Sequence, residues 1–81
     1  MTVSEVERSL LQHGIRADAY CLMGICGSDR YCLVRGSENW SVFFFERGER
    51  VDERHFQTEA EACVYFLDIL LADPSVRHAG N

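Results

Sequence analysis

The chain has 81 residues, of which 47% are hydrophobic and 26% are charged. This length and composition predict one small globular domain and exclude a disordered segment. The net charge is −5, and none of the eight basic residues is a lysine. Because nucleic acid binding needs a concentrated basic face, DNA and RNA are not expected partners.

The first predicted element is a helix over residues 2–13. Val3, Val6 and Leu10 recur at helical spacing and form one apolar stripe. Thr2 with Glu5, or Ser4 with Glu7, has the spacing of a capping box, in which each side chain satisfies a free backbone amide at the helix start. A glycine at residue 14 is typical of a helix end.

Three short turn segments, at 24–28, 36–39 and 47–48, divide the middle of the chain into apolar runs. Links this short normally join neighbouring antiparallel strands, so the pattern predicts a four-stranded antiparallel meander. The strands are expected at residues 19–23, 29–35, 40–46 and 50–56.

A second helix is predicted from the capping box Thr58–Glu61 to the break at Asp73–Pro74. The fold class is therefore α+β, with the element order αββββα and both helices packed on one face of the sheet. We expect residues 1–74 to form one domain and residues 75–81 to form a flexible tail.

A two-residue turn at 47–48 pairs Phe44 with Val51 and Val42 with Glu53. Phe44, Val51 and Val42 then face the helices, together with Trp40. The opposite face is predicted to carry Phe43, Phe45, Asp52 and Arg54. Burying two phenylalanines is worth roughly 3–6 kcal/mol, so a partner is expected to cover that face. A β-bulge at Gly48 would shift this register.

The N-terminus lacks the charged and apolar regions of a secretory signal, and no apolar run reaches the roughly 20 residues that span a bilayer. We therefore expect a cytoplasmic protein without membrane contact. Cys21, Cys26, Cys32 and Cys63 form no CxxC pair and no zinc pattern with histidines. In the cytoplasm they are expected to be free thiols, with Cys26 exposed in a turn.

No arrangement of side chains indicates catalysis. His13, His55 and His78 are spread over a helix end, a strand and the tail, without a nucleophile pattern beside them. The neighbours Asp52 and Glu53 point to opposite faces of a strand and cannot converge on one atom. We therefore expect neither enzyme activity nor a cofactor or metal site.

Four segments of the sequence and the helix that follows them form a pattern that extends over most of the chain. They are Tyr31–Leu33, Trp40–Phe44, Glu46–Gly48 and Phe56–Cys63, followed by a leucine-rich helix. Over residues 15–74 this pattern resembles small bacterial immunity proteins of polymorphic toxin systems of the contact-dependent inhibition type. The resemblance implies a protein that binds and neutralises the C-terminal domain of a sibling toxin. It assigns no catalytic residues to this chain.

The segment from Glu46 to Glu61 contains six acids and three arginines, which suits a basic target such as a nuclease. An NAD-consuming or ADP-ribosylating toxin is the other target considered. The alternative function is a homo-oligomeric adaptor that associates through the same sheet face, and a small enzyme or metal protein is a third. The predicted partner-binding residues are Phe43, Phe45, Glu49, Asp52, Glu53 and Arg54.

Overall fold

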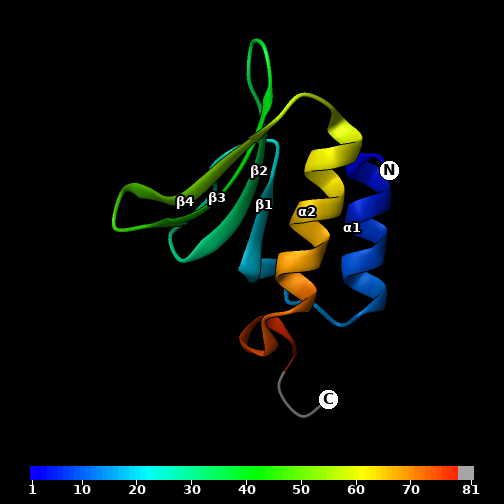
Figure 1. The fold of residues 1–81 in the computed structure, drawn as a ribbon. Coiled ribbons are helices and arrows are strands. Elements are labelled where there is room, and N and C mark those ends of the chain that lie inside the picture. The colour runs from blue at the N-terminus through cyan, green and yellow to red at the C-terminus, as the bar shows by residue number, and fades with distance from the viewer. Residues whose placement is uncertain (79–81) are drawn as a thin grey trace.

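The protein is described by a computed structural model that covers residues 1–78 (Figure 1). The helices α1 and α2 lie on the same side of a four-stranded sheet, and this confirms an α+β fold. The helices are α1 (Val3–Gln12) and α2 (Glu59–Leu71), and short 3-10 turns form η1 (Ala17–Ala19) and η2 (Pro74–Val76). The strands are β1 (Tyr20–Leu22), β2 (Arg30–Arg35), β3 (Trp40–Glu46) and β4 (Glu49–Phe56).

The ends of the helices follow the sequence closely. The Thr2 hydroxyl accepts a hydrogen bond from the Glu5 amide, and the Glu5 carboxylate accepts one from the Thr2 amide, so the predicted capping box is confirmed. Thr58 caps α2 by accepting from the Glu61 amide at 3.2 Å. In addition, the Glu59 carboxylate accepts from the Val3 amide at 3.0 Å, which ties the first turns of the two helices together.

The sheet is mixed rather than purely antiparallel, so the predicted meander is wrong at its first link. The strand order β1-β2-β3-β4 and the antiparallel pairs β2–β3 and β3–β4 agree with the prediction, but β1 runs parallel to β2. A parallel link normally needs a long crossover. Here β1 has only three residues, so residues 23–29 are enough to return the chain to the start of β2.

This return brings two cysteines together. Cys26 lies back over β1 and forms a disulfide with Cys21, with a Cα–Cα distance of 5.8 Å. The expectation of four free thiols is therefore wrong for this pair, although Cys26 is exposed as predicted. Cys32 and Cys63 are free and buried, and burial raises the pKa of both thiols.

A β-bulge in β4 shifts the pairing of the hairpin. Phe44 pairs with Val51 as predicted, but Val42 pairs with Arg54 instead of Glu53. The extra residue lies near Asp52, whose φ is +54°, and not at the turn glycine. The bulge turns Arg54 to the helix side, where its guanidinium lies 5.9 Å from the centre of the Tyr65 ring. The predicted place of Arg54 on the opposite face is therefore wrong.

The main core lies between the helices and the sheet, where α1 and α2 bury Val6, Leu10 and Phe66 against Leu33 and Val42. A smaller cluster on the other face of the sheet contains Cys21, Cys32 and Phe43, with Val34 and Phe45 packed against it. We call this second side the open face.

Phe43 is on the open face, as predicted, but it is only 1% exposed. The Arg50 guanidinium lies 4.4 Å from its ring centre and shields it. The chain itself therefore covers part of the surface that was expected to need a partner.

Residues 75–78 pack against the fold instead of forming the predicted tail. Val76 is 5% exposed and belongs to the main core. Its carbonyl accepts from the Arg16 amide at 2.8 Å, and the His78 amide donates to the Gly14 carbonyl at 2.9 Å. Residues 79–81, the rest of the predicted tail, lie outside the described residues.

Candidate functional site

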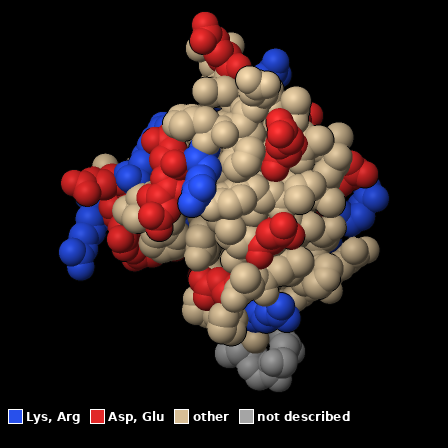
Figure 2. Space-filling model, in the orientation of Figure 1, with Lys and Arg blue, Asp and Glu red and all other residues tan. Residues whose placement is uncertain are grey.

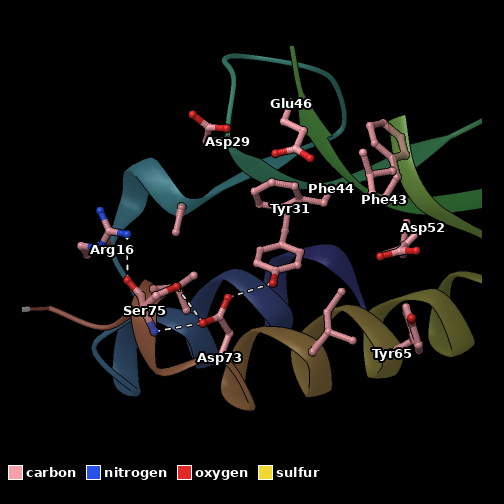
Figure 3. A pocket seen from close by; sticks show the side chains of 15 residues that line it. Arg16, Asp29, Tyr31, Phe43, Phe44, Glu46, Asp52, Tyr65, Asp73 and Ser75 are labelled. Carbon is pink, nitrogen blue, oxygen red and sulfur yellow. Dashed lines mark hydrogen bonds between the residues drawn. The ribbon is translucent and has the colours of Figure 1, made fainter. Parts of the chain in front are cut away.

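A cleft of about 640 Å³ opens between the sheet and the C-terminal half of α2. Its walls are aromatic and aliphatic, and they include Tyr31 and Phe44 from the sheet and Tyr65 and Ile69 from α2. Figure 3 shows Tyr31 spanning the space between the two layers. This volume lies within the range of about 300–1,000 Å³ that is typical of ligand sites.

The bulge in β4 shapes one wall of the cleft. Bulges bend a strand and increase its local twist. In Figure 1 the closed end of the β3–β4 hairpin lies at the left, away from α2. Asp52, the residue with positive φ, lines the cleft beside Val51. Aspartate tolerates this backbone region better than most residues, so the bulge also places a carboxylate in the wall.

A hydrogen-bond network closes the bottom of the cleft. The Tyr31 hydroxyl donates to Asp73 Oδ2 at 2.9 Å, and Asp73 Oδ1 accepts from the Ser75 amide and hydroxyl at 2.9 and 2.7 Å (Figure 3). Burial and the bond to Asp73 raise the pKa of Tyr31 to about 12. The pKa of Asp73 is lowered, most strongly by the hydrogen bond from the Ser75 hydroxyl and also by the bond from Tyr31. The folded protein therefore holds the Tyr31 hydroxyl as a hydrogen-bond donor and the Asp73 carboxylate as its acceptor.

Three further carboxylates line the cleft: Asp29, Glu46 and Asp52. Within residues 1–78 none of them forms an ion pair. The one basic residue in the lining, Arg16, bonds to Asp18 at 2.9 Å and to the Ser75 carbonyl at 3.0 Å. The cleft is therefore a hollow with aromatic walls, in which Asp29, Glu46 and Asp52 form no ion pair within the described residues.

The surface around the hairpin is also rich in charge. Figure 2 shows acidic and arginine side chains crowded at the left, over the hairpin, whereas uncharged residues cover most of the helices. On the hairpin, Arg50 bonds to Glu53 at 2.8 Å, while Glu49 is exposed beside the turn. The hairpin thus presents both signs of charge.

The six predicted partner-binding residues do not form one surface. Asp52 lies in the cleft and Arg54 at the ring of Tyr65, both on the helix side. Phe45 packs on the open-face cluster, where Phe43 is buried. Glu53 is tied to Arg50, which covers the Phe43 ring. The prediction placed Asp52 on the open face, and the bulge is the reason it lies elsewhere.

Sequence reasoning missed most of the cleft. Tyr31, Glu46, Tyr65 and Asp73 come from three separate elements and the turn that follows α2, and no motif links them. The one available signal was their chemical type, since each is an aromatic or acidic residue. The packing of α2 and the turn that follows it against the sheet brings them together.

The open face brings together a serine, a histidine and a glutamate, which match a catalytic triad in residue type only. Ser41 Oγ is 3.1 Å from His55 Nδ1, and His55 Nε2 is 3.9 Å from Glu53. Ser41 is 7% exposed and lies in β3, which pairs with strands on both sides. Its backbone amides are therefore used in the sheet and cannot form an oxyanion hole. This arrangement is better explained as packing.

Residues 1–78 contain no cluster of three or more histidine, cysteine or acidic residues that would hold a metal ion. Across the same residues, neither helix has the length and apolar content needed to cross a membrane. The chain has no match among protein-family models, curated proteins or solved structures.

Proposed function

We propose that this chain is an immunity protein: a non-enzymatic, stoichiometric inhibitor that binds the C-terminal toxin domain of an effector from the same bacterial system. The observation that carries the proposal is the open cleft, whose carboxylates lack a cationic partner within residues 1–78. A cleft of this kind is complementary to a basic protein surface, such as the substrate-binding face of a nuclease.

The charge pattern supports a protein partner of that kind. Carboxylates at an interface guide a basic partner into place and give specificity. The arginines of the hairpin alternate with acids, as is common at the rim of an interface. The resemblance over residues 15–74 gives the same function, and both lines of support concern binding rather than chemistry.

Self-association is supported less well. That alternative depended on exposed phenylalanines on the open face, but Phe43 is 1% exposed and Arg50 lies over its ring. The edge strand β4 carries charged residues and a bulge, two features that discourage pairing between copies.

A cytoplasmic location is part of the proposal, and one feature opposes it. Disulfides persist mainly in oxidising compartments, and the chain has one between Cys21 and Cys26. The redox state of these cysteines in freshly lysed source cells, trapped by alkylation, tests the location. Reduced cysteines support the cytoplasm, whereas a disulfide in rapidly trapped extracts contradicts it.

The function is tested by affinity capture from lysate of the source organism, followed by mass spectrometry. We expect recovery of the C-terminal fragment of a large secreted effector. Co-expression of that fragment with this chain should then restore growth, and the two should form a complex of equal stoichiometry. Growth arrest that persists despite expression of the folded chain would refute the proposal.

A further inference from the structure

We propose that the cleft is a receptor for an arginine side chain carried on a basic segment of the partner protein. The guanidinium would lie against the aromatic wall, within reach of Glu46 and Asp52. The inference rests on the proposed function only in taking the partner to be a protein. The cleft chemistry is argued from the structure alone.

The first step is that the cleft favours a cation. Its wall combines the rings of Tyr31, Phe44 and Tyr65 with the carboxylates of Glu46 and Asp52. Aromatic faces attract cations, and carboxylates in a partly enclosed site form hydrogen bonds to charged donors that are shorter and stronger than neutral ones. No arginine within residues 1–78 forms an ion pair with these two carboxylates, so both can accept hydrogen bonds from a cation that a partner supplies.

The second step is that the aromatic wall is already arranged. The Tyr31 and Phe44 rings are 4.9 Å apart in an edge-to-face arrangement. The bond from Tyr31 to Asp73 fixes the end of the Tyr31 side chain against η2. A ligand therefore meets a wall whose central ring is held in place, and little side-chain freedom is lost on binding.

The third step distinguishes arginine from lysine and from a metal ion. A guanidinium is planar, so it can stack on a ring while its edge donates two parallel bonds to a carboxylate. At the border of the cleft the Arg54 guanidinium lies 5.9 Å from the centre of the Tyr65 ring, so a guanidinium can approach this wall. A metal ion is disfavoured because residues 1–78 hold no cluster of ligands for one.

The fourth step concerns the source of the arginine. Beside the cleft, the hairpin extends a charged surface that a free amino acid would leave uncovered (Figures 1 and 2). A basic protein segment would contact both surfaces, because residues next to the inserted arginine would lie along the hairpin acids. A protein-borne arginine should therefore bind more tightly than the isolated side chain.

The test is a titration of the isolated, isotope-labelled protein, followed by amide NMR. The probes are N-acetyl-arginine amide, the neutral isostere N-acetyl-citrulline amide, N-acetyl-lysine amide, and a short glycine-flanked peptide with a central arginine and further basic residues. We expect saturable shifts around Tyr31 and Tyr65 with the arginine probe, at least tenfold weaker binding of the lysine and citrulline probes, and at least tenfold tighter binding of the peptide.

The matched variants are the pair Glu46→Gln with Asp52→Asn, which removes charge from the cleft, and Glu38→Gln, which removes one charge from the exposed turn between β2 and β3. Asparagine tolerates positive φ, so the pair should keep the bulge. The pair should lower the affinity for the arginine probe at least tenfold, while the control should change it less than twofold.

Three results would overturn the inference. They are no saturable shift with either arginine ligand, the same affinity for the arginine probe in the wild type and in the cleft pair, or the same affinity of the wild type for the lysine and arginine probes. Equal affinity for peptide and amide would make this a small-molecule site and reject the protein segment. None of these results depends on an effector, so failure here and failure of the immunity function are separate outcomes.

Discussion

Tyr31 and Asp73 are 42 residues apart in the chain, yet their side chains share a 2.9 Å hydrogen bond across the cleft. The bond joins the middle of the sheet to the turn that follows α2. Because Asp73 also accepts two bonds from Ser75, its carboxylate orders η2 as well as the tyrosine. One aspartate thus connects the aromatic wall of the cleft with the C-terminal turn.

The tyrosine should titrate abnormally. Its pKa is raised to about 12 in the folded protein, so the stability that it contributes is fully present below pH 10 and is lost as the pH rises toward 12. Absorbance near 295 nm, followed from pH 9 to 13, should show a late-ionising tyrosine that disappears in Tyr31→Phe. In Asp73→Asn that pKa should fall. A late-ionising component that persists in Tyr31→Phe would show that it belongs to another tyrosine, such as Tyr20, whose pKa burial also raises.

Asp73 should contribute stability that is lost at low pH, whereas the contribution of Tyr31 is lost at high pH. Its folded pKa is lowered, so its contribution to stability is present above the unfolded pKa and is lost as the pH falls through the folded value. Urea unfolding between pH 2 and 6 should therefore show a weaker acid dependence in Asp73→Asn than in the wild type. Exposed Asp68→Asn, in the preceding helix α2, is the control and should keep the wild-type slope. Equal slopes for the wild type and Asp73→Asn would contradict this role.

The Cys21–Cys26 disulfide should be detectable by counting thiols. In unfolded, unreduced protein, a maleimide should label Cys32 and Cys63 only, and reduction should make all four cysteines reactive. Closing this short loop restricts the unfolded chain, so reduction should lower stability by about 2 kcal/mol in urea unfolding. Four labels before reduction would show that the purified chain lacks the bond.

The bulge residue should tolerate only certain substitutions. A β-branched side chain at φ +54° is strained by about 1–2 kcal/mol, so Asp52→Val should destabilise the protein by that amount. Asp52→Gly and Asp52→Asn should stay within about 1 kcal/mol of the wild type. The control Glu49→Val, on an exposed residue of the same strand, has no positive φ to strain. If valine and glycine at position 52 gave equal stability, the bulge geometry would be wrong.

Phe43 should behave as a core residue and not as an interface residue. At 1% exposure its truncation to alanine should cost about 3–5 kcal/mol, a large part of the stability of a small domain. Phe45→Ala should cost less, because Phe45 is only partly buried. Thermal and urea unfolding of the two variants provide the comparison. A Phe43→Ala variant as stable as the wild type would mean that the open face is exposed after all.

Much of the fold could be predicted from local signals. The capping box at Thr2, the start of α2 at Thr58 and the pairing of Phe44 with Val51 depend on residues close in sequence, and all three are confirmed. Glycine at residue 14 has φ +71° and ends α1 as expected, with the Ile15 amide bonded to the Leu10 carbonyl.

The errors arose where distant contacts decide the structure. The glycine-rich link after β1 resembles a hairpin turn, and only the short length of β1 lets it serve as a parallel crossover. The bulge at Asp52 has no glycine to signal it, and it moved two predicted interface residues, Asp52 and Arg54, to the helix side. Because the bulge places Asp52 in the cleft wall, no pattern in the sequence could have assigned this residue to the cleft.

The most direct measurement is quantitative capture from lysate of the source organism with three baits: the wild type, Glu38→Gln in the β2–β3 turn, and the cleft pair Glu46→Gln with Asp52→Asn. Cells must be shown to express candidate effectors. The account predicts that the first two baits retain the C-terminal domain of a secreted effector in about equal stoichiometry, and that the cleft pair retains at least tenfold less. Recovery of the bait alone with the wild type, in a wash that known tight complexes survive, would contradict the proposed function.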